Sequence, residues 1–157
     1  MNTLLIIDGV RIYTNASGNY VCFVSDLDIC NDGSGPAHGD PYHQSQTAYY
    51  NGGKYLNADV DRYIVVPPQI RSMVAPVVMG CRARLTNLLT MDTSAAVTGD
   101  IGPSDKTGEA AYCLAKIVNS KISHNIGDST RLYFFELWPG VPANVEGKKY
   151  ALEPAGG

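Results

Sequence analysis

Two acidic residues nine positions apart, Asp100 and Glu109, carry the clearest chemical signal in this chain. Asp100 follows the apolar segment 95–98, which predicts the end of a strand, and Glu109 precedes the segment 110–118, whose apolar spacing predicts a helix. The residues between them are rich in Gly, Pro and Ser and predict a turn. Such a turn can direct both carboxylates into one cleft. Hydrolysis of a glycosidic bond uses two such groups, because one protonates the leaving oxygen while the other activates water or attacks the sugar.

The roles of the two carboxyl groups depend on their surroundings. Thr107 or Gly108 can cap the predicted helix, so that Glu109 lies in its first turn, where the helix dipole lowers the pKa of a carboxyl group. This arrangement favours Glu109 as the base and Asp100 as the acid, whereas burial of Glu109 in a cleft would raise its pKa. In a purely structural interpretation, Glu109 only stabilises the helix end and Asp100 only starts a turn.

Three further acidic residues, Asp26, Asp28 and Asp32, begin a polar segment that extends to residue 53. A loop of this length in a small domain is usually functional. The three carboxylates can form an anionic wall that attracts the ammonium groups of a polyglucosamine, or they can serve as turn formers. A calcium-binding loop is a weaker interpretation, because their spacing does not follow the Asp-x-Asp-x-Asp-Gly pattern.

Other side chains of the polar segment are candidates for contacts with a sugar chain. Tyr49 and Tyr50 precede a Gly-rich turn at 51–53, and we expect them to form an exposed platform on which sugar rings stack. Gln46, in the segment 44–47, is a further candidate for substrate binding. Together with the three aspartates, these residues define the predicted binding surface.

The histidines and cysteines of the chain match no metal-binding spacing. We expect His38, His43 and His124 to be solvated loop residues, and we expect neither a metal nor another cofactor. Without a leader for export to an oxidising compartment, free thiols are favoured over disulfides. The cysteines predicted to be buried free thiols are Cys22, Cys30, Cys81 and Cys113.

Many short strands and one helix must position these residues. The turn signal at 8–9 between two apolar runs predicts a hairpin, and apolar spacing predicts one main helix at about 108–119. The Pro- and Gly-rich segment 141–157 is expected to be a loose tail. Further strands are predicted at 20–24, 63–66, 74–79, 82–91 with a turn at 86–87, 95–98 and 131–138, with a short one near 44–47. This pattern indicates a single, mainly β domain: a compact barrel with long crossing loops.

The composition narrows the possible partners of the chain. The 157 residues carry a net charge of -3, which argues against a nucleic-acid ligand. No apolar run approaches the roughly 20 residues of a membrane span. The apolar run 4–7 is too short for a secretory signal, so we expect synthesis in the cytoplasm, with release by lysis or transport on a phage particle. The oligomeric state is not specified by the sequence.

The segment 26–138 resembles the glycoside hydrolase family 75 chitosanases. The resemblance rests on the acidic segment 26–33, on the segments 44–47 and 63–67, and above all on Gly-Asp, a polar loop and Gly-Glu-Ala at 99–110. It implies a six-stranded double-psi-like β-barrel, with Asp100 and Glu109 as the catalytic pair. It further implies endo-acting hydrolysis of β-1,4-linked glucosamine polymers, with inversion at the anomeric carbon.

This chain departs from the family pattern in its length, in the absence of a signal peptide and in the proline of the loop 101–105. Such a stand-alone domain would suit a bacterium or a phage. Two alternatives therefore stand beside the chitosanase hypothesis. One is a non-catalytic binding or structural protein, for example a phage-borne one, on the same barrel. The other is a peptidoglycan hydrolase that uses the same acid pair.

Overall fold

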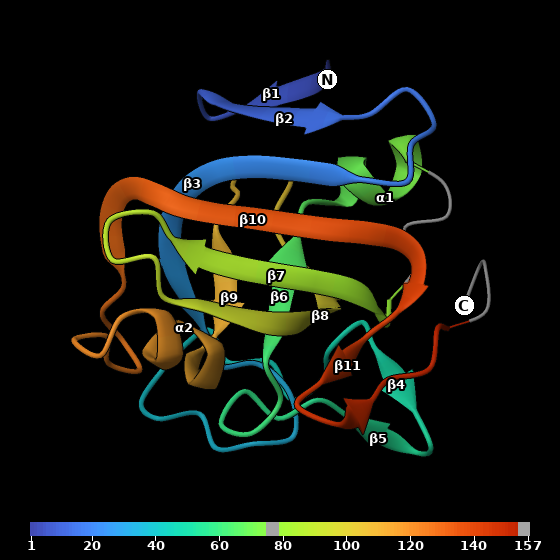
Figure 1. Ribbon diagram of the computed structural model, residues 1–157. Helices are drawn as coiled ribbons and strands as arrows, with labels where there is room; N and C mark the ends of the chain where they lie inside the picture. Colours follow the sequence, from blue (N-terminus) through green and yellow to red (C-terminus); the bar gives the residue numbers. More distant parts are fainter. Residues whose placement is uncertain (75–78, 154–157) are drawn as a thin grey trace.

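Six strands form a closed barrel in the computed structural model, which describes residues 1–74 and 79–153. Around the ring the order is β3 (Val21–Cys30), β10 (Asp128–Pro142), β7 (Cys81–Asn87), β8 (Thr93–Ile101), β6 (Tyr63–Val66) and β9 (Glu109–Ala111). Pairing of β9 with β3 closes the ring (Figure 1). The β3–β9 and β6–β8 pairs are parallel and the other pairs are antiparallel. The predicted fold, a mainly β, six-stranded, double-psi-like barrel, is confirmed.

A hairpin precedes the barrel, as predicted. Strands β1 (Asn2–Ile7) and β2 (Val10–Thr14) pair antiparallel around Asp8 and Gly9, whose φ angles are 47° and 74°. Two consecutive positive φ angles match the twist of hairpin strands, and Asp and Gly tolerate them best. The hairpin continues the sheet beyond β3 and lies at the top of Figure 1.

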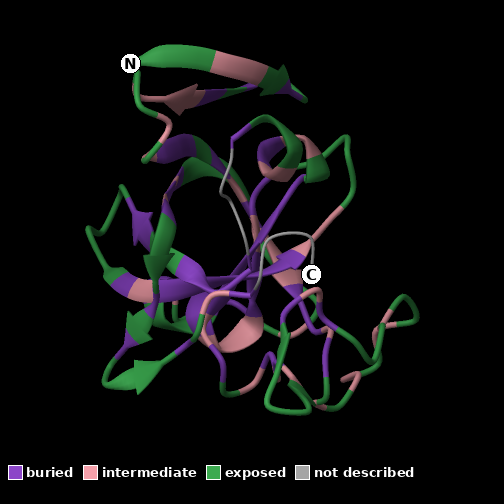
Figure 2. Ribbon diagram, turned by 90° about the vertical axis from the view of Figure 1, so that its right-hand side faces the viewer, coloured by how far each residue is buried: buried purple, intermediate pink, exposed green. Residues whose placement is uncertain are grey.

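The core lies inside the ring, where buried residues of the strands gather (purple in Figure 2). Phe23 of β3 and Phe135 of β10 stack there with ring centroids 5.1 Å apart. All four residues of β6 are buried, because neighbouring elements cover both of its faces. The four cysteines are free thiols, and three of them are buried, which agrees with the prediction except that Cys113 is only half-buried.

Two helices are described where one was predicted. The predicted helix begins later than expected, as α2 (Tyr112–Val118), because Glu109–Ala111 form β9 instead of its first turn. The missed helix is α1 (Pro68–Met73). Its proline occupies the start of the helix, where the missing N–H has no hydrogen bond to lose. Neither described helix is long and apolar enough to cross a membrane.

The loops differ from the prediction in several places. Strand β3 continues to Cys30, so the polar loop begins five residues later than residue 26. No strand forms at 44–47, and a small hairpin of β4 (Tyr50–Asn51) and β5 (Lys54–Tyr55) follows instead. The turn after β7 lies beyond Asn87 rather than at 86–87. Most of the predicted strand 74–79 lies outside the described residues.

The prediction of a loose tail at 141–157 is wrong for the part that the structure describes. Strand β10 runs through Pro139 and Gly140 because it bends there rather than ending, and β11 (Asn144–Val145) pairs with β12 (Lys148–Lys149). The Tyr150 hydroxyl then donates to Asp61 over 2.7 Å. A Cβ on Gly80 would lie 2.2 Å from the Ala151 carbonyl oxygen, so this segment packs directly against the barrel.

Candidate active site

Four neighbouring strands place two aspartates, a glutamate and a valine in one row across the barrel wall. Asp100 on β8 pairs with Val65 on β6, and Glu109 on β9 pairs with Asp28 on β3. The pairing of Ile64 with Ala110 sets Val65 beside Glu109. Paired residues of adjacent strands point to the same face of a sheet. The row therefore runs Asp100, Val65, Glu109 and Asp28, and it brings together the two predicted catalytic residues.

Both glycines that precede the acidic pair are required by close packing. A Cβ on Gly99 would lie 2.4 Å from Leu56 Cδ1, and a Cβ on Gly108 would lie 2.3 Å from the Asp26 carbonyl oxygen. Gly108 also has a φ of 90°, which side-chain-bearing residues rarely adopt. The backbone before each acid thus packs closely, against Leu56 at Gly99 and against β3 at Gly108.

Asp100 is buried, with 8% of its surface exposed. Its Oδ1 accepts hydrogen bonds from the backbone N–H groups of Ala48 and Ile101, both at 2.9 Å. Burial nevertheless raises the pKa of Asp100 to about 6, and the negative charge of Asp32 adds to this effect while the two hydrogen bonds oppose it. The segment around Ala48 therefore both covers the carboxyl group and fixes its orientation.

Glu109 is partly buried, and its carboxyl group accepts no hydrogen bond among the described residues. Burial raises its pKa to about 7, followed by the negative charges of Asp28, Asp100 and Asp32, whereas Lys106 opposes the shift. The predicted lowering of this pKa by a helix end is wrong. Glu109 lies in β9, before the helix begins, so its position in the barrel wall determines its titration.

The predicted anionic wall surrounds the pair, although it is built from a strand as well as a loop. Asp26 and Asp28 lie on the same face of β3, and burial together with the charge of Asp26 raises the pKa of Asp28. A carboxylate oxygen of Asp32, a carboxylate oxygen of Asp100 and the Cys30 sulfur all lie within 4.8 Å of one another. Five carboxyl groups thus share one region of the barrel.

Only one of the two tyrosines predicted to form an exposed aromatic platform is exposed. Tyr50 is 51% exposed and packs against Tyr55, a residue that the sequence did not single out, with ring centroids 4.6 Å apart. Tyr49 is 5% exposed and contacts Tyr150 edge-on, so the prediction that it forms part of an exposed platform is wrong. Its backbone N–H donates to the Gly99 carbonyl, which ties this part of the loop to β8. Gln46 is exposed in the loop.

Two hollows meet at Asp28, the outer end of the row. One, of about 130 Å³, is also lined by Asp26, Lys106 and Arg131. The other, of about 330 Å³, is also lined by His124. Asp28 is therefore accessible at the β3 end of the row, whereas Asp100 and Glu109 line neither of these two hollows.

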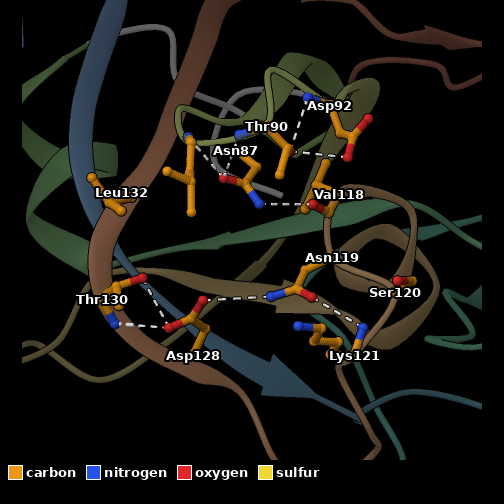
Figure 3. Close-up of a pocket in the computed structure, with 11 residues that line it drawn as sticks. Asn87, Thr90, Asp92, Val118, Asn119, Ser120, Lys121, Asp128, Thr130 and Leu132 are labelled. Atoms are coloured by element: carbon orange, nitrogen blue, oxygen red, sulfur yellow. Dashed lines mark hydrogen bonds between the residues drawn. The ribbon is translucent and has the colours of Figure 1, made fainter.

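Another hollow, of about 300 Å³, lies between the end of β7 and the residues that follow α2 (Figure 3). Its polar groups mostly bond to one another: Asn119 Nδ2 donates to Asp128 Oδ2 over 3.4 Å, and Asn87 Nδ2 donates to the Val118 carbonyl over 3.0 Å. None of the carboxylates of the row lines it. Its side chains hold loops together, and we do not assign the chemistry to it.

Two histidines predicted to be solvated are in fact brought together. His38 and His124 are half-buried, their rings stack with centroids 3.6 Å apart, and both contact the carboxylate of Asp59. No local sequence pattern indicates this cluster, because its three residues come from distant loops and only the closed fold makes them neighbours. His43 is also half-buried rather than solvated.

Comparison with protein-family models and with curated proteins finds no match to this chain. The carboxylate row is therefore described by its own geometry and electrostatics. Its distinctive property is a pair of carboxyl groups, on strands separated by a single strand, whose pKa values both lie near neutrality.

Proposed function

We propose that this protein is an endo-acting glycoside hydrolase that cleaves β-1,4-linked glucosamine polymers with inversion. Glu109 is the general acid and Asp100 the general base. The observation that carries this proposal is the row in which the two carboxyl groups flank Val65 with pKa values of about 7 and about 6. Carboxyl groups that titrate near neutrality are characteristic of acid–base catalysis.

The different surroundings of the two carboxyl groups support these roles. A general acid must hold its proton near neutral pH, which the higher pKa of Glu109 favours. Asp100 is the more readily ionised of the two, and its Oδ1 is held by two backbone N–H groups. Its Oδ2 is then the oxygen that can accept a proton from water. This assignment reverses the one expected from a helix end at Glu109.

The strand spacing leaves room for the wider carboxyl separation that inversion requires. Asp100 and Glu109 lie on β8 and β9, with β6 between them. Two ladder spacings of about 4.8 Å separate their backbones by roughly 10 Å. Inverting glycosidases keep their carboxyl groups about 6.5–9.5 Å apart so that a water molecule fits between one of them and the sugar, whereas retaining enzymes use about 5–5.5 Å.

The charge of the site supports a cationic substrate. Asp26, Asp28 and Asp32 add three carboxylates to the pair, and the positive charge of Lys106 only partly offsets them. A protonated glucosamine chain is attracted to such a surface, and its local concentration rises accordingly. The exposed ring of Tyr50, packed against the half-buried Tyr55, offers an apolar face on which a sugar can stack.

The test is the release of reducing ends from chitosan, chitin and peptidoglycan by the wild type and by Glu109→Gln and Asp100→Asn. We expect cleavage of chitosan by the wild type and a loss of at least about 100-fold in each variant, since each removes a proton-transfer group. Asp105→Asn is the matched control, because Asp105 is an exposed acid of the same loop. Proton NMR of the first products should reveal the α-anomer.

Full activity in both variants would overturn the assignment of Asp100 and Glu109. Cleavage of peptidoglycan alone would identify a different polymer as substrate. A non-catalytic binding protein is the second candidate, and the small exposure of Asp100 beneath the Ala48 segment favours it. Binding of chitosan without cleavage, unchanged in Asp100→Asn, would support that candidate.

A further inference from the structure

A second cluster of polar side chains lies outside the carboxylate row, where three loops meet. His38 comes from the loop after β3, Asp59 from the turn before β6, and His124 from the loop after α2. His38 Nε2 lies 2.7 Å from Asp59 Oδ2, and His124 Nε2 lies 3.2 Å from Asp59 Oδ1. The three donor atoms all lie within 4.8 Å of one another.

Hydrogen bonds from asparagine side chains hold together the loops that carry this cluster. Asn125 Nδ2 donates to the His38 carbonyl over 3.1 Å, and Asn31 Nδ2 donates to the His124 carbonyl over 2.7 Å. The ring of Tyr112 stacks on His124, with centroids 3.5 Å apart. The backbone of each histidine is therefore held in place before any ligand arrives.

We infer that His38, Asp59 and His124 form a binding site for a divalent transition-metal ion, with Zn²⁺ as the best fit. Two imidazole nitrogens and one carboxylate are a common protein donor set for this ion, and they leave at least one position open for water. The side chains are 27–29% exposed, so an ion can reach them from solvent. This inference does not depend on the glycosidase proposal.

Binding through Nε2 requires one particular tautomer of each imidazole. Nε2 of each ring lies within hydrogen-bonding distance of an Asp59 carboxylate oxygen. An ion bound at Nε2 uses the lone pair of that nitrogen, so a neutral ring then carries its proton on Nδ1.

Binding must alter the ring stack. The two imidazole planes lie 22° from parallel, so their in-plane lone pairs point side by side rather than at one point. The rings have to turn about their Cβ–Cγ bonds until both nitrogens face the ion. An occupied site would tie the three loops together more firmly than the hydrogen bonds do, and it would lie beside the hollow that His124 shares with Asp28.

The experiment is titration of the full, metal-stripped chain with ZnCl₂ at pH 7.5, followed by calorimetry and thermal unfolding. We expect one ion per chain, with a dissociation constant in the micromolar range or below and a rise in Tm. Asp59→Asn and His124→Ala should weaken binding at least tenfold. The third histidine provides the control: His43→Gln should bind as the wild type does, because His43 is not part of the cluster.

Cobalt distinguishes this site from one built on the free cysteines. Co²⁺ held by nitrogen and oxygen lacks the intense near-ultraviolet band of a cobalt–thiolate bond, and we expect a spectrum without that band. A thiolate band, equal affinity in Asp59→Asn, or no change in Tm at about 1 mM Zn²⁺ would each overturn the inference. Should His124→Ala fail to fold, His38→Gln, checked by circular dichroism, decides the same question.

Discussion

Glu109 is a carboxyl group that the folded protein holds in an unfavourable environment for its charge. Its pKa is about 7 in the fold, against an ordinary value of 4.5. Between these two values the folded state binds more protons than the unfolded chain does. The free energy of unfolding therefore falls as the pH rises through this window, and the loss is complete above about pH 7.

Replacement of Glu109 by Gln should consequently stabilise the protein at pH 8. We expect a gain of about 1–3 kcal/mol in the free energy of unfolding, since the amide cannot ionise. At pH 4 the wild-type carboxyl group is largely protonated in both states, so the two proteins should differ little. Urea unfolding at both pH values measures this. An equal difference at pH 4 and pH 8 would contradict the electrostatic explanation.

At the scale of single residues, the sequence identified the acidic pair but not its environment. The spacing of Asp100 and Glu109 and the preceding glycines were sufficient to select both. Local patterns could not reveal that Tyr49 turns inward, or that His38 and His124 meet at Asp59, because these contacts join segments that are distant in the chain. The positions of these side chains depend on burial and on long-range contacts, and a short window of sequence encodes neither.

Among the elements of the fold, the short strand β9 has the most influence on the site. It carries Glu109 and lies between β3 and β6. Its three residues are too few for an alternating pattern, and they precede a genuine helix, so the apolar spacing predicted one continuous helix. The hairpin of β1 and β2 was predictable because its Asp-Gly turn is a local signal.

Gly108 is the residue that allows β9 to approach β3, and Gly108→Ala should disrupt this approach. The added Cβ would lie 2.3 Å from the Asp26 carbonyl oxygen, at a φ of 90°. We expect a loss of about 2–4 kcal/mol in the free energy of unfolding. Gly147→Ala is the control: it has a φ of 87° and no neighbour within 4 Å, so it isolates the backbone strain. Equal losses in both variants would show that the close packing is unimportant.

Over the whole molecule, the C-terminal segment up to Glu153 packs against the closed barrel rather than trailing from it. Ala143, Val145 and Tyr150 are buried, and Asp61 accepts hydrogen bonds from the Tyr150 hydroxyl and from Lys148 Nζ. The sequence predicted a loose tail here because Pro and Gly commonly end strands. The contacts that hold the segment involve residues more than 60 positions away, which a local pattern does not encode.

Truncation after Pro142 should therefore destabilise the entire domain. Removal of the segment uncovers apolar side chains and leaves the buried carboxylate of Asp61 without its cation. We expect a fall in Tm of at least about 10 °C, or failure to fold. Truncation after Glu153, which leaves every contact of the described segment in place, is the control. A shortened chain ending at Pro142 with the wild-type Tm would refute the structural role of this segment.

Closure of the ring by β9 and β3 couples folding of the protein to the uptake of protons from the solvent. The same pairing that seals the barrel sets Glu109 beside Asp28, and the negative charges of Asp28, Asp100 and Asp32 all act on Glu109. Because assembled carboxyl groups hold protons that separated ones release, closing the barrel near neutral pH takes up protons from the medium. Formation of the site and proton uptake therefore occur together. The uptake can be measured as a pH change in a weakly buffered solution during refolding.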